Sequence, residues 1–140
     1  RYPPGFSNER LKAFVERFFA AGDDAARDEE YMSYFADSAF YILAMKTAAG
    51  HSEIRRLRRL LWRSTTRRRH EIDLVFPFAC GEDEQTWELG LFGRIHYEMA
   101  EPPGVLLTME WAGRMMVALG ELKVLFYQAY PCTLTIPETE

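Results

Sequence analysis

A chain of 140 residues has the length of one ordinary domain and can bury about two-thirds of its unfolded surface. Hydrophobic residues make up 48% of it and charged residues 27%, a balance that excludes a largely disordered chain. The net charge of −4 at pH 7 argues against a protein that binds polyanions in general.

No segment has the pattern of a metal site, a cofactor site or a membrane helix. Cys80 and Cys132 lie far apart, without a neighbouring ligand pattern. No apolar run reaches the roughly 18 residues that a membrane helix needs, and residues 1–6 lack the apolar stretch of a signal peptide. The sequence also lacks a phosphate loop, a dinucleotide fingerprint and a serine elbow. We therefore expect a cytoplasmic protein that uses no metal or cofactor and binds no membrane.

The first part of the chain predicts two helices after an irregular lead-in, residues 1–7. Ser7 or Asn8 can cap a helix that ends near Gly22. Its apolar residues recur at helical spacing: Leu11, Phe14, Val15, Phe18 and Phe19. A shorter second helix is expected before residue 36, and its aromatic residues are Tyr31, Tyr34 and Phe35.

Residues 39–45 form a dense apolar run of strand length, and a turn is expected at residues 48–50. A third helix is predicted from Ser52 to Arg63, because Ser52 can cap it. Apolar residues recur on one side of this helix: Ile54, Leu57, Leu60 and Leu61.

From His70 onward the apolar period changes from about 3.6 residues to 2, which is typical of strands. The runs over residues 70–78, 87–99, 105–117 and 122–130 are separated by short turns. Four strands joined in this way predict an antiparallel meander with one wet and one dry face.

The helices must bury their apolar faces, and the sheet is the only large apolar surface left. The sequence therefore predicts one α+β domain over residues 1–140, a helix-first cone with a strongly curved antiparallel sheet. The mouth of such a cone is a natural pocket for a small molecule.

Two segments resemble the nuclear transport factor 2-like (NTF2-like) superfamily, in particular its SnoaL-like polyketide cyclases and scytalone dehydratases. Residues 34–41, YFADSAFY, resemble the passage of that family from a helix through F-A-D-D-A into the first strand. Residues 49–55, AGHSEIR, resemble its G-x-x-x-I-R entry to the third helix. The resemblance covers nearly the whole chain. It implies the cone-shaped fold, which hosts enzymes, carriers and dimerisation modules.

The resemblance also implies candidate site residues. Asp24 aligns with a catalytic aspartate of scytalone dehydratases, and His70 aligns with a catalytic histidine. His96 aligns with a second histidine only if one residue is inserted. Leu43 stands where ketosteroid isomerases have their general base, so that reaction is not expected.

The residues themselves support His70 most strongly. Its parity along the strand is that of Ile72 and Leu74, which directs the ring to the dry face, where an imidazole can act as general acid or base. A core histidine bonded to a carbonyl is the alternative. Asp24 could orient His70, although an aspartate at this place is also typical of a helix cap.

Tyr97 lies on the apolar parity of its strand and could donate a hydrogen bond to a substrate carbonyl or an enolate. The expected lining of a substrate pocket is mostly aromatic: Tyr31, Phe35, Tyr41, Leu43, Trp62, Phe76, Trp111 and Tyr127. Packing in the core is the alternative for each of these residues.

The last predicted strand is apolar on both faces, and helices cover only one of them. In the resembled family a second subunit typically covers the other face, which implies a homodimer through the outer face of the sheet.

Eight of the 17 lysine and arginine residues lie between Arg55 and Arg69. Nucleic-acid binding is one interpretation, but a solvated helix face is favoured because no glycine-rich loop or aromatic platform accompanies them.

The predicted function is that of a cofactor-free isomerase, cyclase or dehydratase. Its substrate would be an apolar polyketide- or terpenoid-like molecule of secondary metabolism. The alternative is a non-catalytic NTF2-like dimer that binds a ligand or a protein.

Overall fold

The computed structural model describes residues 1–131, which form three helices and six strands. The helices are α1 (Glu9–Gly22), α2 (Asp28–Ser33) and α3 (Gly50–Leu61). The strands are β1 (Phe35–Leu43), β2 (Lys46–Ala49), β3 (Thr65–Cys80), β4 (Thr86–Met99), β5 (Leu106–Ala118) and β6 (Lys123–Pro131). Cys132 lies outside the described residues.

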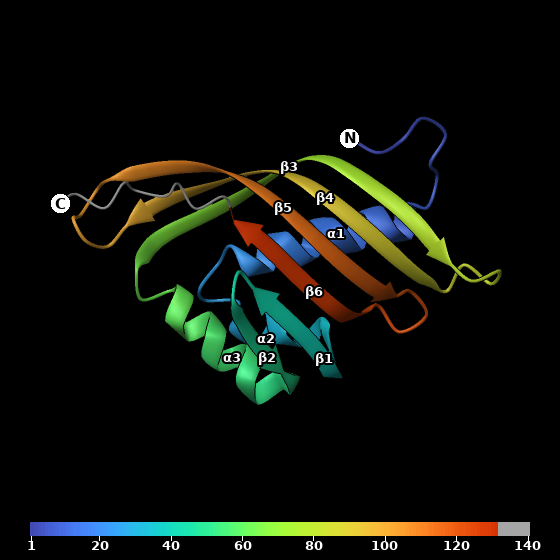
Figure 1. Ribbon diagram of the computed structural model, residues 1–140, viewed down its shortest axis with the longest axis horizontal. Coiled ribbons are helices and arrows are strands. Elements are labelled where there is room, and N and C mark those ends of the chain that lie inside the picture. Colours follow the sequence, from blue (N-terminus) through green and yellow to red (C-terminus); the bar gives the residue numbers. More distant parts are fainter. Residues whose placement is uncertain (132–140) are drawn as a thin grey trace.

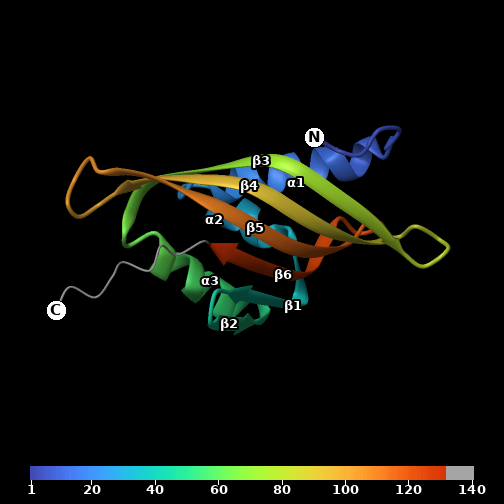
Figure 2. The same ribbon diagram turned by 45° about the horizontal axis from the view of Figure 1, so that its top comes forward.

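The six strands make one sheet in the order β2-β1-β6-β5-β4-β3. The pair β1–β6 is parallel and every other pair is antiparallel, so the sheet is mixed. The sheet curls strongly, and α1 lies behind it across the concave face (Figure 1). The α2 and α3 helices lie near β1 and β2, which form one edge of the sheet. The turn that joins β4 to β5 extends beyond these helices (Figure 2). The predicted α+β cone is confirmed.

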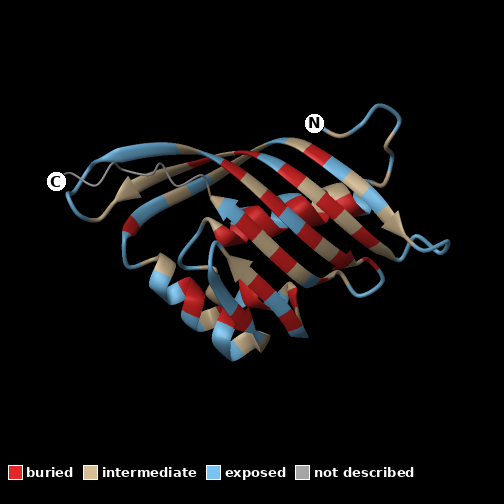
Figure 3. Cartoon of the chain, in the orientation of Figure 1, coloured by how far each residue is buried: buried red, intermediate tan, exposed pale blue. Residues whose placement is uncertain are grey.

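The α1 helix forms for the reasons that its sequence indicates. The Asn8 side chain accepts a hydrogen bond from the Leu11 backbone N–H and so caps the first turn. The apolar stripe faces the sheet, where Phe18 meets Tyr127 and Phe19 meets Trp111 edge to face. Buried positions therefore follow one side of α1 and alternate along the strands (Figure 3).

The segment between α1 and α3 differs from the prediction. The α2 helix ends at Ser33, and β1 begins at Phe35 rather than at residue 39. The expected turn at 48–50 is instead strand β2 running into α3 at Gly50. Pairing of β1 with both β2 and β6 extends it beyond its apolar run, because tertiary hydrogen bonds outweigh local propensity.

A β-bulge at Asp73 changes which residues of β3 face inward. Ile72 pairs with Gly93 and Leu74 with Phe92, so Asp73 is an extra residue in β3. His70 and Ile72 lie on the inner side before the bulge, and buried Val75 lies there after it. The parity expected from the sequence therefore holds for His70 and Ile72 but not for the residues after the bulge.

Phe76 is the predicted pocket residue that this bulge displaces. Its side chain is 53% exposed on the outer face, where it contacts the ring of Phe92. Phe76 therefore does not line the interior of the cone.

Candidate functional site

The interior of the cone holds a cavity of about 40 Å³, which we call the inner cavity. It lies where the end of α1 meets α3 and the concave face of the sheet. Its polar lining residues are Tyr31, Tyr41, Arg58, Arg68, His70, Tyr97 and Tyr127. Its apolar lining includes Phe18, Phe19, Leu43, Ile95 and Trp111. The free volume is little more than that of one or two water molecules, because aromatic side chains fill the cone.

Asp23 and His70 form a hydrogen-bonded pair on the wall of this cavity. Asp23 Oδ1 lies 2.6 Å from His70 Nδ1, and Asp23 Oδ2 accepts the backbone N–H of His70 at 2.7 Å. The two side chains are 15% and 10% exposed. Since an ionised carboxyl group can only accept, Nδ1 carries the proton and Nε2 is left with a free lone pair. This arrangement can accept a proton from a substrate.

Burial lowers the pKa of His70 below its usual value of 6.5, and the hydrogen bond that His70 donates to Asp23 offsets this only in part. The imidazole is therefore neutral near pH 7, which is the form of a general base. The ring also contacts Phe19 and Trp111, which hold its plane. His70 borders a second, more open groove of about 530 Å³ beside α1 and β3.

The structure assigns the partner of His70 to Asp23, not to Asp24. Asp23 is the C-cap residue of α1, and its backbone N–H bonds to Phe19 O at 2.9 Å, which turns its side chain toward β3. The Asp24 side chain instead accepts the backbone N–H of Ala26 at 2.9 Å. Asp24 therefore caps the turn after α1, which was the alternative interpretation of this residue. It does not orient His70.

Four tyrosine phenol groups line the same cavity. Burial raises the pKa of Tyr31 to about 12 and raises the pKa values of Tyr41, Tyr97 and Tyr127 as well. All four phenols are therefore protonated at neutral pH and can donate hydrogen bonds. Tyr97 is the most accessible of them, since it also borders the outside of the cavity.

Arg58 organises the wall of the cavity on the side of α3. Although charged, it is only 2% exposed. Its guanidinium donates to Asp28 Oδ1 at 2.8 Å and to the carbonyl oxygens of Gly22 and Asp24 at 3.1 and 2.8 Å. These carbonyls lie at the C-terminal end of α1, where a positive charge is favourable.

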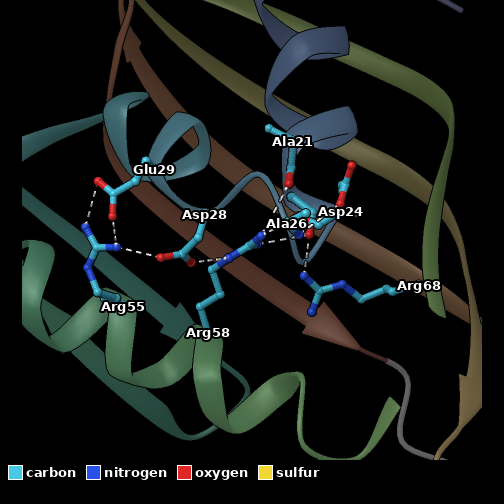
Figure 4. A network of polar contacts seen from close by, with 9 residues as sticks. Ala21, Asp24, Ala26, Asp28, Glu29, Arg55, Arg58 and Arg68 are labelled. Atoms are coloured by element: carbon cyan, nitrogen blue, oxygen red, sulfur yellow. Dashed lines mark hydrogen bonds and ion pairs between the residues drawn. The ribbon is translucent and has the colours of Figure 1, made fainter. Parts of the chain in front are cut away.

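Figure 4 shows the continuation of this network: Asp28 also contacts Arg55, which in turn pairs with Glu29.

Arg68 lies on the opposite side of the same helix end. Its Nη2 donates to Gly22 O at 2.6 Å, and its side chain is 8% exposed. The guanidinium lies over the ring of Trp62, 4.7 Å from the ring centroid. Arg58 is therefore buried and Arg68 is partly buried, so the expected solvated face holds for others such as Arg56, Arg59 and Arg63.

An open groove of about 900 Å³, which we call the mouth groove, adjoins the inner cavity. Arg68 and Tyr97 belong to both linings, so they stand between the two spaces. Other residues of the groove are Asp23, Asp24, Trp62, Arg67, Arg69, Leu106 and Leu107. The volume of the groove is that of a small-molecule site, which the inner cavity alone is not.

The residues expected around a substrate separate into four groups. The first group lines the inner cavity together with His70 and consists of Tyr31, Tyr41, Leu43, Tyr97, Trp111 and Tyr127. Trp62 lines the mouth groove, and Phe35 is buried in the core against Phe18 and Tyr31. Phe76 lies on the outer face, as described above.

Three residues of the site were not among the predicted ones: Asp23, Arg58 and Arg68. Arg58 carried a signal in the sequence, because it falls on the apolar stripe of α3 beside Ile54 and Leu57. Asp23 and Arg68 carried none, since their positions depend on how the end of α1 meets β3.

His96 does not line the inner cavity, but it lies at the edge of the mouth groove. Its two ring nitrogens lie 2.9 Å from Glu71 Oε2 and from Thr108 Oγ1. Within residues 1–131, no cluster of three or more His, Cys, Asp or Glu side chains is placed to hold a metal ion. None of the helices in that range has the length and hydropathy needed to cross a membrane.

No protein-family model matches the chain, and no curated protein matches it. Solved structures resemble it over most of its length. A proposed dehydratase of the NTF2-like family from Streptomyces avermitilis is 14% identical with a TM-score of 0.75, covering 90% of this chain and 97% of the other. A proposed SnoaL-like polyketide cyclase from Shewanella denitrificans is 8% identical with a TM-score of 0.69, covering 89% and 91%.

The Mtr2–Mex67 M domain complex of C. albicans contains a chain that is 10% identical with a TM-score of 0.67, covering 90% of this chain and 96% of that one. The chain therefore has the NTF2-like fold. At these identities the likeness concerns the fold alone, and it extends to proteins with quite different descriptions.

Proposed function

We propose that this NTF2-like protein is a cofactor-free acid–base enzyme that isomerises, cyclises or dehydrates an apolar, oxygenated molecule. The substrate class is polyketide- or terpenoid-like, as in secondary metabolism. The observation that carries the proposal is the pairing of His70 Nδ1 with Asp23 at 2.6 Å inside the cone. A structural histidine would need no free, neutral ring nitrogen beside a cavity.

In the proposed reaction, His70 Nε2 takes a proton from a carbon next to a substrate carbonyl. The electron pair of the broken C–H bond moves onto the carbonyl oxygen and forms an enolate. Tyr97 donates a hydrogen bond to that oxygen, since its phenol is protonated. The imidazolium then returns the proton to another carbon in an isomerisation or to a departing hydroxyl group in a dehydration.

Asp23 is a positioning residue in this scheme. It holds the imidazole in the tautomer with a free Nε2, and its charge stabilises the imidazolium that forms. The size of the inner cavity means that the body of the substrate occupies the mouth groove and only its reacting end enters the cone.

The proposal is tested with 2-tetralone, an apolar ketone with acidic protons next to its carbonyl. The enzyme should speed the exchange of these protons for deuterium in D₂O, followed by NMR. His70→Gln keeps hydrogen bonding but removes the titrating nitrogen, so it should slow the exchange about 10²- to 10⁴-fold. His51→Gln is the matched control, because His51 lies at the start of α3 and lines neither the inner cavity nor the mouth groove. Equal exchange by the wild type and His70→Gln would contradict the role of His70.

A second candidate function is that of a non-catalytic module that binds a ligand or a protein. The observation in its favour is the small inner cavity, about 40 Å³, which the protein's own aromatic side chains nearly fill. In this case the wild type and both histidine variants should give the same exchange of 2-tetralone.

We further propose that the protein is a homodimer through the outer face of its sheet. This face carries exposed aromatic residues, including Phe76, Phe92 and Tyr130. It also carries both signs of charge, for example the pairs Arg94–Glu71 and Arg114–Glu88. A surface with both signs can be complementary to itself, as a twofold interface requires.

A further inference from the structure

Two arginines reach the end of α1, and the protein uses their donors very unequally. Arg58 donates through all three nitrogens of its guanidinium group, to Asp28 and to three backbone carbonyls. For Arg68, the one hydrogen bond to residues 1–131 is that from Nη2 to Gly22 O. Of the five N–H groups of a guanidinium, Arg58 therefore uses four and Arg68 uses one.

The spare donors of Arg68 include one that is shut off from solvent. Among residues 1–131, neither the buried Arg68 Nε nor the buried Trp62 Nε1 has a hydrogen-bond partner. The two groups are neighbours, since the guanidinium stacks on the Trp62 ring at 4.7 Å. Buried donors without acceptors carry a free-energy penalty, which an incoming acceptor group would relieve.

The carboxyl groups around the mouth groove do not serve as those acceptors. Asp23 Oδ1 is 3.8 Å from Arg68 Nε, beyond hydrogen-bond distance, and both of its oxygens are bonded to His70. The Asp24 side chain bonds to Ala26 N. Glu98 lies nearest to the exposed Arg67, at 3.6 Å. Asp23 is thus an ion-pair partner of Arg68, and what Arg68 Nε lacks within residues 1–131 is a hydrogen-bond acceptor, a role that the carboxylate of a ligand can fill.

The rest of the groove suits an apolar body behind such an anion. Leu106 and Leu107 are 74% and 43% exposed, and they line the groove together with Trp62. Planar carboxylates match the fork of donors on a guanidinium, and flat rings match an indole face.

We propose that Arg68, together with Trp62, binds the carboxylate of the substrate, and that the substrate is therefore an aromatic or similarly flat carboxylic acid. This inference rests on the proposed function, because it assigns the substrate class of the same site. Arg68 also lines the inner cavity with His70, and a single oxygen, Asp23 Oδ1, lies between their side chains. Binding the carboxylate at Arg68 places the acid at the boundary between the mouth groove and the inner cavity.

Binding is measured with 2-naphthoate and with 2-naphthamide, which has the same rings and no charge. The readout is the indole N–H signal of Trp62 in an NMR titration, assigned with Trp62→Phe. This signal should shift with 2-naphthoate, whereas that of Trp87 should not, because its Nε1 already donates to Glu84 O at 2.8 Å. The amide should bind at least about 10-fold more weakly. Equal binding of the amide, or of acetate, would overturn the proposal.

Arg68→Gln should weaken 2-naphthoate binding about 10- to 100-fold. Arg67→Gln is the matched control, since Arg67 is in the same groove but its side chain is 85% exposed. If both variants lose affinity equally, the effect is one of general charge and the proposal fails. If Arg68→Gln does not fold, Arg68→Lys tests the same contact, because it keeps the charge and removes the fork, and unchanged affinity would count against the proposal.

His70→Gln separates this proposal from that of the enzymatic function. It should bind 2-naphthoate as the wild type does, because the anchor is unchanged. Binding that survives while 2-tetralone exchange is absent from the wild type would contradict the enzyme and keep the anion site. Exchange that depends on His70 without selective binding of 2-naphthoate would support the enzyme and contradict the anion site.

Discussion

Asp23 binds His70 twice, once at the ring and once at the backbone. Its Oδ1 is 2.6 Å from Nδ1 and its Oδ2 is 2.7 Å from the backbone nitrogen. One carboxyl group thereby joins the end of α1 to strand β3 and sets the plane of the imidazole.

Asp23→Asn should lower the activity while the protein stays folded. An amide at this position can present its NH₂ group to Nδ1, which favours the tautomer that lacks a free Nε2. We expect 2-tetralone exchange to fall at least about 10²-fold, with an altered pH dependence. Asp24→Asn is the control, because an asparagine can still accept from Ala26 N. Equal losses in the two variants would indicate a defect of the turn rather than of the pair.

The neutral state of buried His70 predicts how stability depends on pH. Its pKa in the folded protein lies below the value of about 6.5 expected in the unfolded chain. Below pH 6.5 the unfolded chain therefore takes up the proton first, so the contribution of His70 to stability is lost as the pH falls. Urea unfolding at several pH values should show that the free energy of unfolding falls less with decreasing pH for His70→Gln than for the wild type. Parallel curves for the two proteins would contradict this assignment.

Arg58→Met should destabilise the protein strongly. It removes the buried charge that pairs with Asp28 and takes one donor away from the carbonyl oxygens of Gly22 and Asp24. Breaking a buried ion pair on one side typically costs about 3–5 kcal/mol of unfolding free energy. Arg59→Met, one residue further along an exposed side of α3, should change it by less than about 0.5 kcal/mol. Urea unfolding measures both, and a mild effect of Arg58→Met would show that the site can repack.

The bulge in β3 can be tested through the residue that faces it. A Cβ atom on Gly93 would lie 1.9 Å from Glu71 O, so an alanine forces the backbone apart. Gly93→Ala should cost at least about 2 kcal/mol of unfolding free energy. In Gly90→Ala the nearest atom to the new Cβ is 3.7 Å away, which is an ordinary contact. Similar unfolding midpoints for the two variants would argue against a close approach at Gly93.

The proposed dimer predicts a light-scattering mass of twice the chain mass of 16.3 kDa at micromolar concentration. Phe92→Lys places a charge in the centre of the apolar outer face and should yield the single-chain mass. Met45→Lys is the control, because Met45 is 97% exposed in the turn between β1 and β2. A wild-type protein with the mass of one chain would contradict the proposal.

The sequence by itself determined the class of the fold and much of its interior. The stripe from Leu11 to Phe19 predicts the buried side of α1, and the change of period near His70 predicts the sheet. Both signals are local, because the repeat of a helix or strand decides which side chains share a face. The same parity predicted that His70 faces inward. His70 does so because both it and Ile72 precede the bulge at Asp73.

Only the tertiary structure decided which residue pairs with His70 and which residues form the site. The end of α1 presents Asp23 rather than Asp24 to β3, and the bulge at Asp73 turns Phe76 outward. The sequence places Arg58 and Arg68 in a stretch interpreted as solvated, yet both donate hydrogen bonds to Gly22 O at the end of α1. Each of these facts depends on segments far apart in the chain meeting at hydrogen-bond distance, and a shift of one residue in either segment would exchange the side chains that meet.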